Sequence, residues 1–268
     1  MAALSDVGAA GLAVGQAETA ADVRSAAGAQ DSASLAQLVP LDSNDRVRLL
    51  LDEASGSLAN SGGAGGSWTA GSGLVYGEKV FLSGGVRVGS GIDGLAGSNA
   101  VEPTTLTLWA WLRLRSGALG DEGVILGKPH PASASPTWAD PYWSVRLGVN
   151  SSRQIIASRS KTADPIWPSR LETLSFALTA RTDYLVGLTY DGSRLSIWVD
   201  GDEVAAATNG GTIAYGTAGV TPWVAGYVWS GGGYDRHDSY VGALGICDVA
   251  RPSSWWREMY RRGMGRYR

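Results

Sequence analysis

The chain has 268 residues, of which 44% are hydrophobic and 18% are charged, and its formal net charge is −3. This balance excludes binding of nucleic acid or of an anionic membrane driven by bulk charge. The only cysteine is Cys247, which excludes an intrachain disulfide framework and the multi-cysteine zinc sites.

Residues 1–45 differ from the rest of the chain because they are rich in Ala, Ser, Gly, Gln and Asp and contain no aromatic residue. Helical propensity over 18–26, with Thr19 or Asp22 as the cap, predicts a short helix within a segmented arm. A flexible tail is the alternative, because the segment has too few large apolar residues for a core. Neither a signal peptide nor a stretch of about 18 apolar residues occurs, so we expect cytoplasmic synthesis and no membrane insertion.

From Val47 onward, short runs of β-forming residues alternate with Gly, Asn, Asp and Ser turns, which is typical of an all-β sandwich. Over 106–113 the alternation puts Trp109 and Trp111 on one face and the leucines on the other. Asp191-Gly192 predicts a hairpin turn between strands at 185–190 and 195–199, and Asp200-Gly201 predicts another turn. Further strands are expected over 124–127, 142–149, 154–158, 173–180, 203–207 and 241–248.

The C-terminus favours a short helix over 252–263. Ser253 or Ser254 is the expected N-cap, basic residues lie in the last turn, and Gly263 is the expected stop. Trp255 and Met259 lie four residues apart, so we expect both to dock on the sandwich.

Residues 184–201 contain an almost complete "hydrophobic-x-Thr-Tyr-Asp-Gly … Trp-Val-Asp-Gly" hairpin and resemble the concanavalin A-like (laminin-G-like) lectin/glucanase superfamily. Stretches at 49–52, 80–85, 106–113 and 240–252 resemble further strands of that family. The resemblance implies a two-sheet antiparallel jelly-roll sandwich over 46–268, with an opening strand at 49–52 and a second at 80–85. It also implies structural roles for Trp111 and Trp198, and Cys247 is expected to be a small buried residue.

Residues 17–29 resemble a segment of bacteriophage tail-fibre and other virion appendage proteins. The resemblance implies that residues 1–45 bind other virion structural proteins and that the protein is located in the virion. A homo-oligomer such as a trimer would suit a fibre, although no heptad repeat in the arm decides the oligomeric state.

Catalytic motifs are missing from the sequence. Glycosidases of the superfamily carry Glu-x-Asp-x-x-Glu on a strand, which places carboxylates on one face, and this chain has no such motif. The nearest carboxylate cluster, at 200–203, falls in a predicted turn. No Gly-x-Ser-x-Gly nucleophile motif occurs and only two histidines are present, so the sequence predicts that the protein is not an enzyme.

A loop that contains Asp235, His237 and Asp238 is a weak candidate for a metal site, and calcium is the ion that such oxygen-rich loops bind. The favoured interpretation is a solvated surface loop, because the ligands are few. No cofactor is therefore expected.

Aromatic residues concentrate in three segments that lack strand alternation, at 137–143, 166–168 and 227–235. Indole and phenol rings stack on sugar faces, but they also occur at contacts between subunits or pack within the fold. The candidates for glycan or subunit contact are Trp138, Tyr142, Trp143, Trp167, Tyr227, Trp229 and Tyr234.

These features favour a non-enzymatic virion structural or adhesion protein, a tail or capsid appendage whose lectin-like sandwich binds host-surface polysaccharide or decorates the particle. The alternative is a carbohydrate-binding lectin module of a bacterial surface or secreted system.

Overall fold

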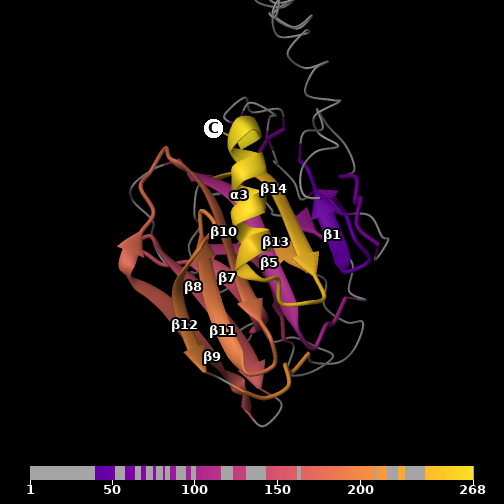
Figure 1. Cartoon of the computed structure of the whole chain (residues 1–268), viewed down its shortest axis with the longest axis vertical. Helices are drawn as coiled ribbons and strands as arrows, with labels where there is room; N and C mark the ends of the chain where they lie inside the picture. Colours follow the sequence, from indigo (N-terminus) through magenta and orange to yellow (C-terminus); the bar gives the residue numbers. More distant parts are fainter. Residues whose placement is uncertain are drawn as a thin grey trace, which may run out of the picture. The chain divides into compact units, whose positions relative to one another are not determined.

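A computed structural model gives the structure of the chain (Figure 1). The chain divides into two compact units, Met1–Pro40 and Leu41–Arg268. The helix predicted over 18–26 lies outside the described residues, and the anchoring role of residues 1–45 stays a prediction. The described residues are 40–51, 58–63, 68–70, 75–76, 81, 85–88, 95–97, 101–115, 123–130, 143–161, 164–208, 210–215, 223–226 and 239–267.

Within this described part, fourteen strands form two antiparallel sheets of seven strands each. The first sheet contains β1 (Asp45–Leu49), β3 (Val86–Val88), β5 (Leu106–Leu114), β10 (Asp183–Tyr190), β11 (Arg194–Val199), β12 (Asp202–Thr208) and β14 (Ser239–Cys247). Its order is β1-β14-β5-β10-β11-β12, with β3 also paired to β14.

The second sheet contains β2 (Thr69–Ala70), β4 (Leu95–Ala96), β6 (Gly123–Pro129), β7 (Trp143–Val149), β8 (Gln154–Lys161), β9 (Asp164–Ala177) and β13 (Val224–Ala225). Its order is β2-β4-β13-β6-β7-β8-β9. Together with one C-terminal helix, α3 (Ser253–Tyr267), the two sheets confirm the predicted all-β sandwich.

The hydrophobic core lies between the sheets, where alternate residues of the facing strands meet. Leu106, Leu108 and Leu112 of β5 belong to the core, as the alternation predicted, and Val145 and Leu147 of β7 contribute from the other sheet. Burial of these apolar side chains is the main favourable term in folding of the unit.

Helix α3 covers the outer face of the first sheet (Figure 1). Trp111 of β5 stacks on Tyr260 of the helix with ring centroids 6.1 Å apart, and Trp198 of β11 stacks on Trp256 at 5.4 Å. Trp111 is therefore fully buried although it points away from the core. The predicted docking of the helix is confirmed, and Trp256 contributes to it in addition to the two residues expected.

The helix does not stop at Gly263 as predicted but continues to Tyr267. A Cβ atom at Gly263 would overlap the Trp111 ring, so a residue without a side chain is needed there for close packing. Gly263 is therefore a contact residue of the helix and not its end.

Three strand predictions differ from the structure. The opening strand is β1 at Asp45–Leu49 rather than 49–52, because Leu51 has a φ of 54°, which is incompatible with extended structure. Most of the strand expected at 80–85 lies outside the described residues, which show a strand directly after it at Val86–Val88. Residues 166–168, expected in a loop, lie in β9, because an edge strand tolerates prolines that cannot donate a hydrogen bond.

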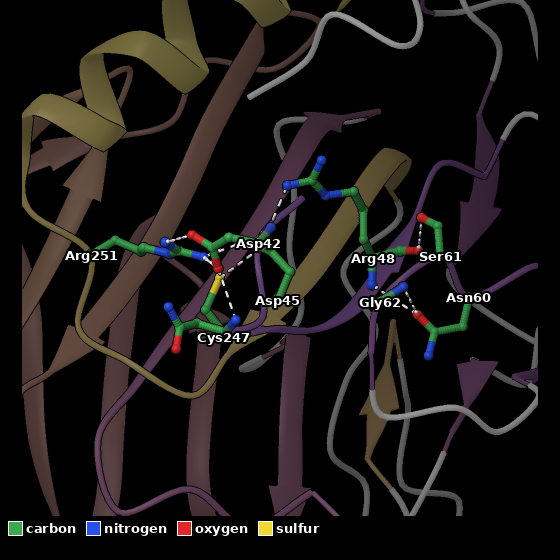
Figure 2. A network of polar contacts seen from close by, with 9 residues as sticks. Asp42, Asp45, Arg48, Asn60, Ser61, Gly62, Cys247 and Arg251 are labelled. Atoms are coloured by element: carbon green, nitrogen blue, oxygen red, sulfur yellow. Dashed lines mark hydrogen bonds and ion pairs between the residues drawn. The ribbon is translucent and has the colours of Figure 1, made fainter. Parts of the chain in front are cut away.

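Charged side chains join the segment before β1 to the end of β14 and the start of α3 (Figure 2). Arg251 donates two hydrogen bonds to the carboxylate of Asp42, at 2.6 and 2.8 Å, and holds the pKa of that carboxyl down at about 2. Asp45, which is 1% exposed, lies 3.5 Å from the guanidinium of Arg48 and 3.4 Å from that of Arg251. Two carboxylates and two guanidiniums thus balance in this cluster, which we call the terminal clasp.

Cys247 lies in the terminal clasp, where its thiol donates a hydrogen bond to Asp45 over 3.2 Å. Burial and the adjacent Asp45 carboxylate raise the pKa of this thiol to about 12. Asn60 extends the network by accepting hydrogen bonds from the backbone of Arg48 and Gly62 at 3.0 and 2.9 Å (Figure 2). The clasp therefore fastens β1 to elements about 200 residues later in the sequence.

Replacing Gly187 by alanine should weaken the docking of α3. A Cβ atom there would overlap the Trp256 ring and lie 2.5 Å from the carbonyl oxygen of Leu108. We expect the Gly187→Ala variant to lose about 1–3 kcal/mol of unfolding free energy, measured by urea denaturation, as overpacked sites do. Gly210→Ala is the matched control, because its nearest neighbour is 3.9 Å away. Equal stability of both variants would contradict the packing argument.

Replacing Asp45 by asparagine should leave two nearly buried guanidiniums without their shared carboxylate. Breaking a buried ion pair from one side typically costs about 3–5 kcal/mol, and we expect Asp45→Asn to destabilise the protein by an amount in this range at pH 7. Asp202→Asn provides the control, because the side chain of Asp202 is 76% exposed. The thermal unfolding curves of the two variants are compared. Indistinguishable curves would show that the terminal clasp contributes nothing to stability.

The Cys247 thiol should be inert in the folded protein. Only the thiolate is nucleophilic, and a buried thiol with a pKa of about 12 is almost wholly protonated at pH 8. We expect no reaction with a chromogenic disulfide reagent until denaturant unfolds the chain, after which one thiol per chain reacts. Rapid labelling of the native protein would show that the clasp opens readily.

Candidate functional site

The aromatic residues predicted for glycan or subunit contact fall in very different positions. Trp143 begins β7 and its side chain is described. Trp167 lies on β9. Trp138, Tyr142, Tyr227, Trp229 and Tyr234 lie outside the described residues, as do the weak metal candidates Asp235, His237 and Asp238.

Trp143 packs on the outer face of the second sheet and not in the main core. It clusters with Val124 and Val224, and its ring lies over Gly127, where a Cβ atom would approach it to 3.0 Å. A register irregularity between Lys128 and Pro129 accompanies this placement, since strict alternation would point Trp143 to the core side with Val145. The indole is 7% exposed.

Polar side chains share this outer face. Arg146 of β7 is paired in register with Gly127 of β6 on one side and with Ser158 of β8 on the other. Ser144 is fully buried and directly follows Trp143, at the irregularity that interrupts the alternation of β7. We call this surface, formed by Val124, Gly127, Trp143, Ser144, Arg146, Ser158 and Val224, the Trp143 face.

Several polar atoms of the Trp143 face have no hydrogen-bond partner among the described residues. These are Nε1 of Trp143 and the hydroxyl oxygens of Ser144 and Ser158, all of which are buried. Ser160, by contrast, donates its hydroxyl to the carbonyl oxygen of Trp143. Because a buried polar group without a partner costs free energy, this face is suited to a ligand or water that supplies the missing bonds.

Two glycines shape the floor of the site. Gly127 makes room for the Trp143 ring, and the aliphatic part of Arg146 lies along Gly148, with its Cγ and Cδ 3.7 Å from where a Cβ atom would be. Both large side chains therefore lie along the sheet. The face brings together an indole, a guanidinium and hydroxyl groups, all of them nearly or fully buried.

Arg146, Ser144 and Ser158 were not among the predicted site residues, because aromatic residue type was the feature that selected them. A signal was present: polar residues alternate with Val145, Leu147 and Val149 along β7, which is the pattern of a strand with one apolar and one polar face. What the sequence could not give was the register that pairs Arg146 with Ser158.

A second group of buried charges faces the opposite way, into the sandwich. Lys128 and Arg159 flank Val145 in one row of the second sheet. Lys128 pairs with Glu102 at 3.1 Å, and burial lowers the pKa of this lysine despite that partner. Arg159 stacks on Tyr190 at 4.2 Å and donates to the Gly210 carbonyl at 2.9 Å. The contact between Arg159 of β8 and Tyr190 of β10 joins the two sheets, and the others fasten the second sheet to loops.

Neither a metal centre nor a membrane span is found in the described part of the chain. No group of three His, Cys, Asp or Glu side chains there is placed to hold an ion. Among the described helices, none has the length and apolar character that crossing a membrane requires.

No protein-family model and no curated protein matches the sequence. Solved structures match it in fold. A Trypanosoma rangeli sialidase in complex with sialic acid is 15% identical with a TM-score of 0.59, over 91% of this chain and 38% of the sialidase. The botulinum neurotoxin type G receptor-binding domain is 12% identical with a TM-score of 0.57, over 81% of this chain and 51% of that domain.

The prediction that the protein is not an enzyme is wrong. A sialidase, which is an enzyme, is among the structures that match this chain in fold. The chain lacks the two-carboxylate motif of most glycosidases, but sialidases use a tyrosine nucleophile and do not need that motif. The chain spans about a third to a half of the length of these proteins, at identities that establish fold alone. The described unit is therefore a β-sandwich of the kind found in the sialidase and the neurotoxin domain.

Proposed function

We propose that this protein is a carbohydrate-binding β-sandwich and that its ligand contacts the Trp143 face. The observation that carries the proposal is the group of buried polar atoms without partners beside Trp143. A pyranose ring offers an apolar face that stacks on an indole and hydroxyls that exchange hydrogen bonds with serine and arginine side chains.

The similar structures support the proposal at the level of ligand class. One is a sialidase in complex with sialic acid, and the other is a receptor-binding domain. The ligand of the first is a sugar acid, which is the observation among the comparisons that favours a saccharide as the ligand class.

At a finer level, the proposal includes attachment of a virion to its host, with residues 1–45 as the anchor. Its support is the resemblance of residues 17–29 to bacteriophage tail-fibre and virion appendage proteins. A lectin module of a bacterial surface or secreted system fits the same sandwich equally well. Binding of the full chain to purified particles that lack it would favour the virion role, and binding to bacterial envelope alone would favour the alternative.

Replacing Trp143 by alanine should abolish most of the glycan binding. Truncation of a central tryptophan in a binding site costs about 2 kcal/mol or more, so we expect roughly 30-fold weaker binding of the full chain on a glycan array. Trp143→Phe, which keeps a ring, should lose less.

Trp255→Ala is the matched control, because Trp255 is similarly buried but lies in α3 on the other sheet. The proposal fails if the folded wild-type chain binds no glycan, or if Trp143→Ala, shown to be folded by circular dichroism, binds as tightly as the wild type.

A further inference from the structure

We propose that two copies of this chain associate through the outer edge of β12, which pairs antiparallel with the same strand of the second copy. The inference goes beyond the proposed function, because it concerns the first sheet and needs no saccharide. It is carried by a difference between β12 and the other edge strands of the sandwich. Those strands are covered, short or interrupted by proline, and β12 is none of these.

The opposite edge of the first sheet, at β1, is covered by a loop segment of the same chain. Ser61 donates its backbone N–H to the carbonyl oxygen of Arg48 at 3.0 Å, and Gly63 donates to that of Asp45 at 2.7 Å. A bridge between Leu49 and residue 60 continues the contact. The backbone groups of β1 that face away from β14 therefore have partners, and no further strand is needed there.

The edges of the second sheet are protected in another way. β9 contains Pro165 and Pro168, which lack the N–H that a neighbouring strand would bond to. At the other end of this sheet, β2 has only two residues. Prolines and short length are the devices by which natural sheets avoid pairing at their edges. These two edges are therefore poor acceptors of another strand.

Neither device is present at β12, which has seven residues and contains no proline and no lysine. Within the described part of the chain it pairs with β11 alone, and no loop exchanges backbone hydrogen bonds with it. An edge strand of this kind presents a row of N–H and C=O groups that a further strand can bond to. Its first two residues and Thr208 are exposed and the residues between them are half-buried, so the strand lies at the surface.

The charges at β12 are balanced within the chain. Arg194 of β11 donates a hydrogen bond to the carboxylate of Glu203, and the guanidinium of Arg257 lies 3.8 Å from the carboxylate of Asp202. Two carboxylates and two guanidiniums leave this edge without net charge. A strongly charged partner would thus find no electrostatic attraction here, whereas an identical, neutral edge can approach without repulsion.

The sequence of β12 is complementary to itself when two copies run antiparallel. With the strands overlapping over their whole length, Ala205 lies opposite its own copy, Asp202 lies opposite Thr208, and Glu203 lies opposite Ala207. No like charges then face each other, and short side chains meet at the centre. Such a pair has a two-fold axis and is closed, so it gives a dimer and not a longer assembly.

The test measures the mass of the full chain by light scattering and sedimentation over a series of concentrations. One pair of strands buries less than the roughly 1,200–2,000 Å² of a stable interface, so we expect a dimer that dissociates on dilution. Ala206→Lys puts on the edge the charge that natural edge strands use against pairing, and should weaken the dimer about 10-fold or more. Ser152→Lys, in an exposed turn between β7 and β8, is the matched control and should leave it unchanged.

A cysteine in place of Ala205 tests the register and keeps the proposal testable if Ala206→Lys does not fold. Directly opposite residues have Cβ atoms about 5 Å apart, close enough for a disulfide to form with small adjustment. The native Cys247 is buried and does not compete. Under mild oxidation Ala205→Cys should give a covalently linked dimer, whereas Ser152→Cys should not.

A trimer overturns the proposal, as does a dimer that Ala206→Lys leaves intact and Ala205→Cys does not link. A monomer at all concentrations up to about 1 mM also overturns it. Hydrogen exchange then identifies the occupant of the edge: protected β12 amides in the monomer indicate another segment of the same chain, and rapidly exchanging amides leave the edge to a different protein. Binding of glycans is independent of every one of these outcomes.

Discussion

The stacking of α3 on the first sheet is the contact on which the arrangement of this sandwich depends. Strand β5 sits between β14 and β10 and is buried on both faces, by leucines toward the core and by tryptophans toward the helix. Gly187 leaves room on the sheet for the Trp256 ring of the helix, and Gly245 leaves room for the Trp109 ring of β5.

The terminal clasp keeps the helix in place from its N-terminal side. Arg251 precedes α3 by two residues and binds Asp42, while its backbone N–H donates to the Thr107 hydroxyl on β5 over 2.8 Å. The helix therefore starts from a point fixed to the first residues of the unit and to the central strand. Since Asp45 is shared by Arg48 and Arg251, loss of one charge would disturb β1 and the helix together.

Sequence patterns predicted those parts of the fold whose cause is local. The alternation over 106–113 gave β5 and its two faces, and Asp191-Gly192 gave a hairpin in which Gly192 has a φ of 99° and the Asp191 carboxylate accepts from the Arg194 backbone at 2.7 Å. Two-residue strands such as β13 were missed because two residues carry no periodicity. Gly263 was wrongly predicted to end the helix. The contact that requires a glycine there is with the Trp111 ring, which comes from a residue about 150 positions earlier in the sequence.

The candidate site shows the same division between local and distant causes. Trp143 was a candidate by residue type and stays a prediction, and its neighbours Arg146 and Ser158 are brought beside it only through the register of β7 with β8. The enzyme prediction failed for a related reason, because a missing motif excludes one mechanism and says nothing of others built on the same sandwich.

Rigid strands also determine what the Trp143 face can distinguish. Its indole, guanidinium and hydroxyls come from paired positions on adjacent strands, so the distances between them follow from the spacing of the sheet. Groups held in this way lose little entropy when a ligand binds, which favours selection by geometry over adaptation. Replacing Gly127 by a larger residue would press on the Trp143 ring, and a Cβ atom at Gly148 would lie 2.6 Å from the carbonyl oxygen of Gly123, so the packing of this face depends on two residues that have no side chain of their own.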